Sequence, residues 1–352
     1  MLPFVYDALP SRVIFGADSL DKLPEEIDRL GASKALVLCS PEQHDLGSAL
    51  LDRLSPRAAG LFPRAVMHVP LEVAQSAREE ASRLHADCCV AIGGGSTTGL
   101  AKAIALTSGL PILAIPTSYA GSEMTPIWGI TESGVKKTGR DLRVLPKTVL
   151  YDPTLTLTMP PRLSATSGIN SLAHCVEAIY AKDANPIISM IAEEGIRAMA
   201  SSLPAIADHP GDIDARSRAL YGAWLGGIAL GAVGMALHHK LCHTLGGTFN
   251  LPHAETHTVI LPHAVAYNEA AAPVAMARVA RALDTTSAAQ GVFDLAKSLG
   301  APVSLQSIGM PEAGLDRAAE LAVQNPYYNP RPVTQSGIRE LLQRAFEGRR
   351  PA

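Results

Sequence analysis

The sequence predicts a two-domain protein, with an α/β domain over residues 1–158 and an all-α domain over residues 159–352. Three observations support this prediction. The N-terminal part alternates short apolar runs with amphipathic stretches, which is typical of a parallel sheet covered by helices. After about Pro160 the alternation stops, and long helical patterns rich in Ala, Leu and His follow. The length of 352 residues also fits two domains of ordinary size.

Four short apolar runs are the candidate strands of the N-terminal domain. Strands of a parallel sheet are buried on both faces, so they contain few polar residues. Only His68 interrupts the apolar character of these runs. The candidate strands are Ala35–Cys39, Ala65–Val69, Cys88–Ile92 and Ile112–Ile115.

The helices between these strands are expected where apolar residues recur at helical spacing with charges between them. This pattern occurs at Asp18–Leu30, Ser48–Leu54 and Val73–Leu84. The domain boundary is expected within Tyr151–Pro161, because the paired prolines at its end suit neither a helix interior nor a central strand. We expect a cleft between the two domains.

Composition and charge exclude several classes of protein. The chain is 47% hydrophobic and 18% charged, which excludes a mainly disordered state. Thirty basic and 33 acidic residues give a net charge of -3, so no overall field attracts nucleic acid or an anionic membrane. The five cysteines are an odd number without CxxC spacing, and the N-terminus lacks a secretory signal pattern. We therefore expect a reduced, cytoplasmic chain.

One uncharged stretch, Ala219–Leu237, is close to the length that spans a bilayer. Several glycines leave it only mildly hydrophobic, and no second stretch of this kind accompanies it. We expect a helix that is buried on all sides in the C-terminal domain, where glycines allow neighbouring backbones to approach closely. A membrane is not an expected partner.

A run of three glycines follows the strand expected at Cys88–Ile92 and precedes a helix-forming stretch. Gly93, Gly94 and Gly95 permit positive φ angles and close approach, and the free amides of a helix start attract an anion. Ser96 adds a hydroxyl. The pattern is neither the spaced GxGxxG fingerprint nor a P-loop, and a simple strand-to-helix turn is the alternative. We interpret it as a turn that binds a diphosphate.

A second loop follows the strand expected at Ile112–Ile115 and carries short hydroxyl side chains beside Gly121. Ligands of α/β proteins bind at the carboxyl ends of strands, where both loops lie. The alternative is that these hydroxyls bond only to loop backbone. Together the two loops predict a cradle for a dinucleotide. The candidate cofactor-binding residues are Gly93, Gly94, Gly95, Ser96, Thr117, Ser118, Ser122 and Thr125.

Histidines are concentrated in the first half of the C-terminal domain. A spacing of four places Asn170 and His174 on one helix face, and His239 and His243 on another. Their nitrogens suit Zn²⁺ or Fe²⁺ with a position open to substrate, or metal-free donation to an oxyanion. Core histidines with satisfied hydrogen bonds explain any one of them, but not the whole set. The set is His174, His238, His239, His243, His253, His257 and His263, with His253 expected on a loop.

Four motifs resemble the iron-containing alcohol dehydrogenase superfamily and, within it, the maleylacetate reductase branch. They are GGGSTTGLAKAIA, IPTSYAGSEMTPIWGIT, SGINSLAHCVEAIY and HHKLCHTLGGTFNLPHAETHTVILPH. The resemblance runs in order over nearly the whole chain, and YAGSEMTPIWGIT and NPYYNPRPVT look specific to that branch. It implies a Rossmann-like dinucleotide-binding domain, an all-α catalytic domain of the dehydroquinate synthase-like fold, and a homodimer.

The resemblance also implies an activity. It implies an oxidoreductase that uses NADH or NADPH to reduce maleylacetate, and substituted maleylacetates, to 3-oxoadipate in the degradation of aromatic compounds. A metal-dependent alcohol dehydrogenase that acts on a small alcohol or aldehyde is the main alternative. A lyase of the dehydroquinate synthase type and a nucleotide-binding module without enzymatic activity are further alternatives.

Metal ligands follow from the resemblance residue by residue. Metal-dependent relatives bind the ion with a Gly-x-Asp-x-x-x-His motif and two further histidines. Here Asn170 takes the place of the aspartate, and the histidines correspond to His174, His239 and His253. A neutral amide in place of a carboxylate removes one ligand charge, so we favour metal-free chemistry. Fe or Zn at Asn170, His174, His239 and His253 remains the alternative.

Catalytic and substrate-binding residues are expected in the same region. His243 and His253, helped by His239 or His174, are expected to donate to an enolate oxygen and to supply a proton. Lys240, Tyr119 and His238 are expected to contact a dicarboxylate substrate; Lys136, Lys137 and Arg140 are further candidate cations. No Asp or Glu occupies positions 39–41 to hold the adenosine ribose, which favours dual use of NADH and NADPH.

Overall fold

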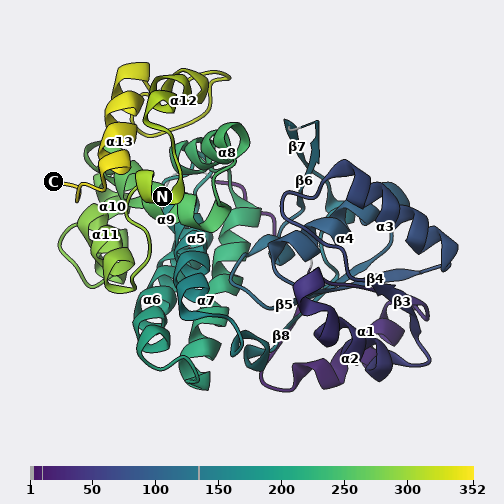
Figure 1. The fold of residues 1–352 in the computed structure, drawn as a ribbon. Helices are drawn as coiled ribbons and strands as arrows, with labels where there is room; N and C mark the ends of the chain where they lie inside the picture. The colour runs from purple at the N-terminus through teal and green to yellow at the C-terminus, as the bar shows by residue number, and fades with distance from the viewer. Residues whose placement is uncertain (1–3, 10, 134) are drawn as a thin grey trace. The chain divides into compact units, whose positions relative to one another are not determined.

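The computed structural model describes residues 4–9, 11–133 and 135–352. Two compact units are present, Ala8–Met159 and Pro160–Ala352, and residues 4–7 group with the second unit (Figure 1). The division falls within the segment that contains the paired prolines, one residue after the predicted boundary. The prediction assigns residues 4–7 to the first domain, but no helix or strand pattern in the sequence determines their place.

The first unit is built on a six-stranded parallel sheet with the strand order β1-β8-β5-β4-β2-β3. The four inner strands are buried along their whole length, which explains why their sequences are apolar apart from Thr148 in β8. The strands are β1 Arg12–Phe15, β2 Ala35–Leu38, β3 Ala58–Phe62, β4 Cys88–Gly93, β5 Ile112–Pro116 and β8 Thr148–Tyr151. A separate antiparallel hairpin consists of β6 Ile127–Glu132 and β7 Val135–Arg140.

One predicted strand is wrong. The segment 65–69 is a loop, and the strand that pairs with β2 is Ala58–Phe62. Left-handed φ angles of 66° at His68 and 49° at Val69 prevent this segment from being a strand. The real strand contains Ala and Gly, which have weak β propensity, and its pairing with β2 at the sheet edge determines its conformation instead.

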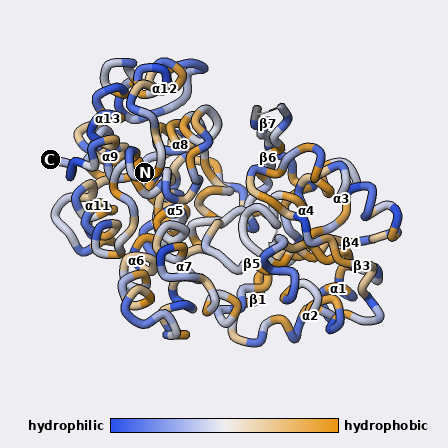
Figure 2. Tube along the Cα trace, in the orientation of Figure 1, coloured by the Kyte–Doolittle hydropathy of each residue, from blue (hydrophilic) through white to orange (hydrophobic). Residues whose placement is uncertain are grey.

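Helices cover both faces of this sheet (Figure 1). The predicted helices are present with shifted ends, and the first begins as a 3₁₀ turn at Ser19–Lys22. Alternate residues of the inner strands pack against α1 and α2 on one face and against α3 and α4 on the other, so apolar residues line the interior (Figure 2). The helices are α1 Leu23–Arg29, α2 His44–Leu54, α3 Leu71–Arg83 and α4 Gly95–Ser108.

The strand order reverses between β2 and β4. From β2 the chain continues to β3 on one side, whereas β4, β5 and β8 follow one another on the other side. Ligands of open α/β sheets bind at such a switch point, beyond the carboxyl ends of the strands. Two segments stand there, Ser40–Gln43 after β2 and Gly93–Gly95 after β4.

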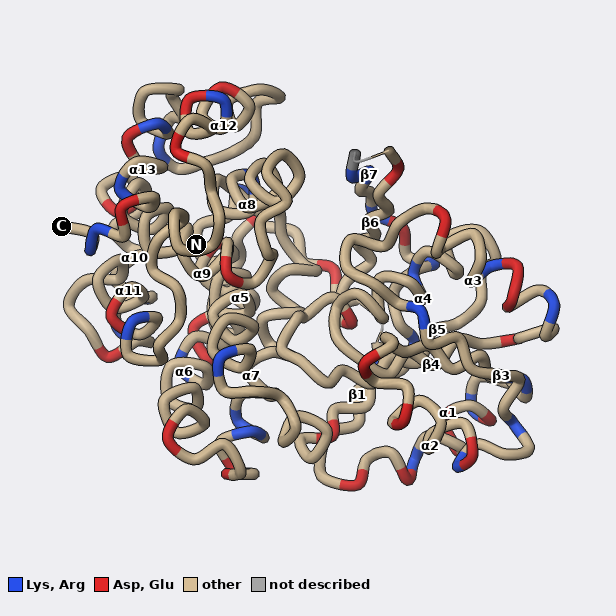
Figure 3. The backbone as a smooth tube through the Cα atoms, in the orientation of Figure 1, with Lys and Arg blue, Asp and Glu red and all other residues tan. Residues whose placement is uncertain are grey.

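The second unit is helical throughout, as predicted. Helices α5, α6 and α7 pack on one another, whereas α8, α9, α12 and α13 share an apolar core. Within each unit, acidic and basic side chains are interspersed (Figure 3). The helices are α5 Pro161–Ile179, α6 Pro186–Asp208, α7 Ile213–Ala232, α8 Leu237–Phe249, α9 His253–Asn268, α10 Pro273–Ala282, α11 Ala288–Ser298, α12 Leu315–Ala322 and α13 Gln335–Glu347.

The uncharged stretch Ala219–Leu237 is not one helix, which corrects the prediction. Helix α7 ends at Ala232, α8 begins at Leu237, and the two helices meet at 95°. The N–H of Gly234, in the break, donates to Asp183 Oδ1 at 3.0 Å. Across the described residues, no single helix is long and apolar enough to cross a membrane; this bent pair passes that test by length and composition only.

Candidate active site

The glycine turn joins β4 to α4. Gly93 has a φ of 152°, and a Cβ there would lie 2.4 Å from Thr97 Oγ1, so this position requires glycine. Gly94 has a φ of -81° and Gly95 is already helical, so of the three glycines, which all permit a positive φ, only Gly93 adopts one. The following helix starts at this turn and directs its first backbone N–H groups out of the sheet edge.

The loop after β5 approaches the glycine turn closely. A Cβ at Gly94 would lie 3.1 Å from Ser118 Oγ, and a Cβ at Gly95 would lie 3.2 Å from Ala120 Cβ. Ser96 and Ser118 are partly exposed at this edge. The structure therefore brings the two predicted loops together and leaves two hydroxyl groups accessible beside the start of α4.

Lys102 of α4 anchors the β5 loop from inside. Its side chain is fully buried, and its Nζ donates to the backbone oxygens of Ser122 (2.6 Å), Thr125 (2.8 Å) and Ile127 (2.8 Å). The hydroxyl oxygens of Ser122 (3.2 Å) and Thr125 (2.9 Å) also lie within hydrogen-bond distance of this nitrogen, so its three N–H groups are shared among the five oxygens. Thr125 is buried and its hydroxyl donates to the backbone oxygen of Ser122 at 3.1 Å, so it has no donor left for a cofactor. Ser122 is partly exposed, and a cofactor contact there stays a prediction.

Burial lowers the pKa of Lys102 to about 7, although the nearby Glu123 carboxylate acts in the opposite direction. Burial also raises the pKa of Glu123, which accepts a hydrogen bond from Tyr151 Oη at 2.8 Å. The loop thus rests on a buried polar network that the sequence motif alone does not reveal.

Thr117 is held by a residue that the sequence analysis missed. Gln43 Nε2, from the turn after β2, donates to Thr117 Oγ1 at 2.8 Å. This bond joins the carboxyl ends of β2 and β5 on either side of the glycine turn. Thr117 is mostly buried, so its role is to fix the loop beside Ser118.

Six imidazoles from α5, α8 and α9 form a histidine cluster in the second unit. Ring centroids lie 4.3–6.2 Å apart along the pairs 174–239, 238–239, 239–243, 239–257, 238–257 and 253–257. His243 and His253 are exposed, whereas the other four are buried. The members are His174, His238, His239, His243, His253 and His257. Only the two exposed imidazoles are accessible to a substrate.

Glu177 holds this cluster in place from its buried side, and it is a residue that was not predicted from the sequence. Its carboxylate is fully buried and accepts the backbone N–H groups of Ala236 (3.0 Å) and His238 (2.8 Å) at the start of α8. It also lies 2.7 Å from His239 Nδ1. The sequence contains a signal for Glu177, because this residue follows His174 by three positions and therefore shares its helix face.

The hydrogen bonds of Glu177 determine its charge. Burial by itself raises the pKa of a carboxyl, but the bonds from His239 and from the backbone of Ala236 and His238 bring the pKa of Glu177 below its usual range. An ionised Glu177 accepts the Nδ1 proton of His239, so His239 Nε2 faces away from it. That nitrogen is buried and has no hydrogen-bond partner among the described residues.

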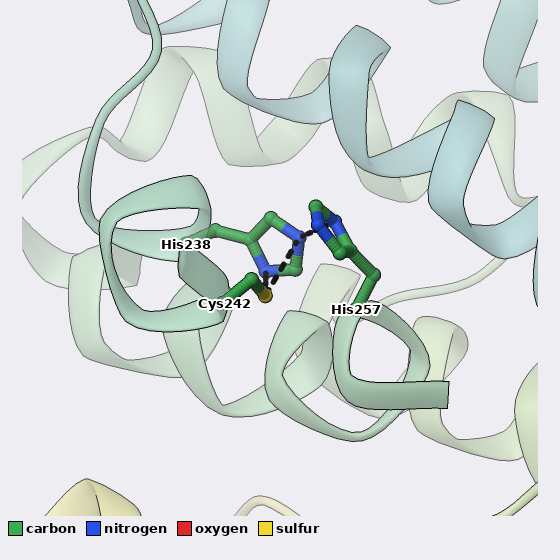
Figure 4. Close-up of side chains that lie close together, drawn as sticks. All are labelled: His238, Cys242 and His257. Atoms are coloured by element: carbon green, nitrogen blue, oxygen red, sulfur yellow. Dashed lines mark hydrogen bonds between the residues drawn. The ribbon is translucent and has the colours of Figure 1, made fainter. Parts of the chain in front are cut away.

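The deepest part of the cluster joins α8 to α9. His238 Nε2 lies 2.9 Å from His257 Nδ1, and Cys242 Sγ lies 3.7 Å from His238 Nε2 (Figure 4). His238 is fully buried, so the structure does not support the predicted contact between His238 and substrate. His257 takes part in the cluster although no role was predicted for it beyond membership of the histidine set.

Burial keeps the inner imidazoles neutral. It lowers the pKa of His174, His238 and His257 well below the usual value, and neighbouring histidines lower it further. A neutral imidazole offers one donor and one acceptor or ligand nitrogen. These three residues are therefore suited to hydrogen bonding or to metal coordination.

The predicted metal ligands fit a divalent ion in their donor atoms. Asn170 Oδ1, His174 Nδ1 and His239 Nε2 are all buried, and none has a hydrogen-bond partner among the described residues. Among His, Cys, Asp and Glu of the described chain, the only group of three or more with all ligand atoms within 4.8 Å of one another is His238, Cys242 and His257. The donor atoms suit an ion, but Asn170 and the histidines supply no negative charge. The nearby negative charge is that of Glu177, which lies behind His239.

Four predicted residues lie elsewhere or differ in context. His263 borders a separate cavity lined also by Tyr267 and Arg344, and among the described residues no ring contact joins it to the cluster. Tyr119 is fully buried in the first unit, whereas Lys240 is partly exposed on α8. His253 is the first residue of α9 and not part of a loop.

Comparisons with known proteins agree along the whole chain. The family model of the iron-containing alcohol dehydrogenase matches residues 10–153, and that of the C-terminal part of the Fe-containing alcohol dehydrogenase family matches residues 164–346. Maleylacetate reductase from Burkholderia cepacia is 60% identical over 352 residues, with 100% of both chains covered. Maleylacetate reductase from Sphingobium indicum is 56% identical over 350 residues, with 99% of each covered.

A solved structure shows the same fold over its full length. The crystal structure of maleylacetate reductase from Agrobacterium tumefaciens has a TM-score of 0.97 and 56% identity, and the match covers 100% of each chain. The predicted fold class is therefore confirmed in both units. The chain belongs to the iron-containing alcohol dehydrogenase family.

Proposed function

We propose that this protein is an oxidoreductase that reduces maleylacetate to 3-oxoadipate with a reduced nicotinamide dinucleotide. The observation that carries the proposal is the 60% identity to the maleylacetate reductase of Burkholderia cepacia over the complete length of both chains. We include substituted maleylacetates among the proposed substrates, and we place the reaction in the degradation of aromatic compounds.

The cofactor is assigned to the edge formed by the two loops of the first unit. The N–H groups at the start of α4 and the hydroxyls of Ser96 and Ser118 suit a diphosphate, because they combine hydrogen-bond donors with the positive end of a helix. A bound reduced nicotinamide supplies the hydride. Residues 39–41 contain no carboxylate, and the exposed Glu42 lies one position further on. We propose that both NADH and NADPH serve as hydride donors. Paired steady-state assays with the two cofactors measure any preference between them.

The reaction adds a hydride to the double-bond carbon that is β to the ketone of the substrate. The electron pair of the double bond moves onto the ketone, which becomes an enolate, and the α carbon then takes up a proton. His243 and His253 are the exposed imidazoles of the cluster, so we assign to them the donation to the enolate oxygen and the delivery of the proton.

The buried residues position this pair. His239 packs against His243 with ring centroids 6.2 Å apart, and Glu177 fixes the orientation of His239. His257 packs against His253 with centroids 4.3 Å apart, and His238 bonds to His257. Each exposed histidine is thus backed by a buried histidine that has its own fixed partner.

A metal-dependent alcohol dehydrogenase activity is the second candidate, because Asn170, His174 and His239 each carry a buried donor atom without a hydrogen-bond partner among the described residues. With His253 these residues would hold Fe²⁺ or Zn²⁺, which polarises a substrate oxygen when bound. The neutral Asn170 weakens such a site, so we favour the metal-independent reaction. We further propose a cytoplasmic homodimer without nucleic acid or membrane as partner; light scattering after size exclusion measures the oligomeric state.

One experiment distinguishes the two candidates. Chelator-treated protein is mixed with NADH and freshly generated maleylacetate, and the absorbance of the nicotinamide is followed. Rapid oxidation of NADH supports the proposed function. Oxidation that appears only with a small aldehyde, and only after Fe²⁺ or Zn²⁺ is restored, would replace it with the second candidate.

A further inference from the structure

Lys240 is a cation without an anionic partner in the part of the chain that the structure describes. It lies on α8, between His239 and His243, and is partly buried. No carboxylate forms an ion pair with it among the described residues, and its Nζ lies 5.7 Å from the ring centroid of Tyr327. A partly buried ammonium group is more stable when an anion approaches it.

Tyr327 carries a second unused donor at the same place. Its hydroxyl oxygen is buried and has no hydrogen-bond partner among the described residues. A buried tyrosine hydroxyl normally has a partner. Burial raises the pKa of Tyr327, and the charge of Glu177 raises it further, so the hydroxyl stays protonated and lies within the field of the Glu177 carboxylate below the histidine cluster.

The segment that carries Tyr327 is fixed to α9. Tyr267 Oη donates to the backbone oxygen of Pro332 at 2.8 Å. The side-chain amides of Asn268 and Asn329 bond to each other in both directions, at 3.0 and 2.7 Å. Arg331 lies over the ring of Tyr267, 4.1 Å from its centroid. Tyr327 is therefore held in place. This gives a role to the polar, proline-rich motif NPYYNPRPVT, which neither the cofactor site nor the histidine cluster uses.

We propose that Lys240 and Tyr327 together bind one carboxylate of the dicarboxylate substrate. This inference rests on the proposed function and assigns to it a residue, Tyr327, that determines specificity. The ammonium group and the phenol hydroxyl both donate to the anion, and Lys240 lies three residues before His243 on α8. The pair thereby selects a diacid over a neutral ketone and holds its reactive carbons beside the exposed imidazoles.

Two variants test the pair, Lys240→Met and Tyr327→Phe. Because the carboxylate does not change during the reaction, its binding contributes equally to substrate and transition state. We expect the KM for maleylacetate to rise roughly 10- to 100-fold for Lys240→Met and about 10-fold for Tyr327→Phe, with kcat within about threefold of the original. Lys240→Arg, which keeps the charge, should recover much of the loss. The neighbouring Tyr328→Phe and the exposed Lys297→Met serve as matched controls and should leave KM unchanged.

Product analogues identify which carboxylate is bound. 3-Oxoadipate is compared as an inhibitor with 4-oxopentanoate and 3-oxopentanoate, which each lack one of its two carboxylates. The original protein should bind 3-oxoadipate more tightly than either monoacid. The Lys240→Met variant should bind 3-oxoadipate no more tightly than it binds the monoacid that lacks the carboxylate held by the pair. In the double variant the two losses should not add, because both donors hold the same group.

The outcomes separate this inference from the proposed function. If the original protein does not oxidise NADH with maleylacetate, the proposed function fails. If it does, but Lys240→Met and Tyr327→Phe keep KM within twofold and retain the preference for the diacid, the pair does not bind the carboxylate. A fall in kcat with KM unchanged would also contradict the inference, because it would show that the pair acts on the chemical step.

Discussion

Individual residues in the histidine cluster differ in what they can do, although they are the same type. His243 and His253 are exposed, His174 and His239 lie behind them, and His238 and His257 are fully enclosed. Burial makes the innermost imidazoles neutral, so they orient their neighbours and do not supply charge. The sequence spacing groups these residues but does not reveal their depth.

Replacement of His243 by Ala should lower kcat by about 10²- to 10⁴-fold, because it removes a donor to the enolate oxygen and a proton source. The affinity for the dinucleotide, measured by quenching of protein fluorescence, should stay the same. The exposed His209→Ala serves as control. Equal losses in kcat and in cofactor affinity, or no loss at all, would contradict the role assigned to His243.

Replacement of Glu177 by Gln should affect both stability and turnover. The amide NH₂ faces backbone donors at Ala236 and His238, so about 1–3 kcal/mol of unfolding free energy should be lost. His239 also loses the anion that orients it, so kcat should fall ~10- to 100-fold at a temperature where the variant is folded. Glu194→Gln, which breaks a surface ion pair with Arg197, is the control. If Tm falls but kcat does not, Glu177 has only a structural role.

At the level of elements, the chemistry depends on where helices begin and end. Helix α8 starts at Leu237 because the chain turns through 95° after α7, and Glu177 accepts the N–H groups at this new helix start. The uninterrupted apolar pattern of Ala219–Leu237 conceals the break. The misplaced strand at 65–69 has a related cause, since the edge strand β3 exists through pairing with β2 and not through its own propensity.

The anchor between α4 and the β5 loop should make stability depend on pH. The pKa of Lys102 is lowered to about 7, below its usual value of 10.5, so between these values the unfolded chain binds more protons than the folded one. Stability from this group therefore rises with pH across this window, by up to about 1.4 kcal/mol per pH unit.

Urea denaturation of the original protein and of Lys102→Met, from pH 7 to pH 9.5, isolates this contribution. The variant should be less stable throughout, because the backbone oxygens of Ser122, Thr125 and Ile127 lose their donor. The stability difference between the two proteins should widen as pH rises. Parallel pH profiles would show that Lys102 does not titrate in this window.

At the scale of the whole molecule, each unit encloses its cysteine thiols in its own interior. All five cysteines are free and buried, and burial raises the pKa of Cys89 and of Cys175 to about 12. Ellman's reagent at pH 8 should therefore detect less than one thiol in the native protein and five after unfolding in guanidinium. Fast reaction of one thiol in the native state would mean that one of these cores opens readily.

The sequence by itself determined the features that depend on local pattern. The fold class, the glycine turn after β4 and the pairing of His239 with His243 all follow from periodicity, from glycine positions and from helical spacing, which need no partner elsewhere in the chain. Recognition of the family motifs added the candidate ligands and the expected reaction.

Only the tertiary structure decided the features that depend on distant contacts. Glu177 meets the start of α8 across 61 residues, and Tyr327 is fixed to α9 through bonds that span a similar distance. The contact of the Ser122 and Thr125 hydroxyls with Lys102 likewise depends on a buried amine brought from the preceding helix. Burial and long-range hydrogen bonds arise when separate segments pack together, and for this reason no local pattern in the sequence reveals them.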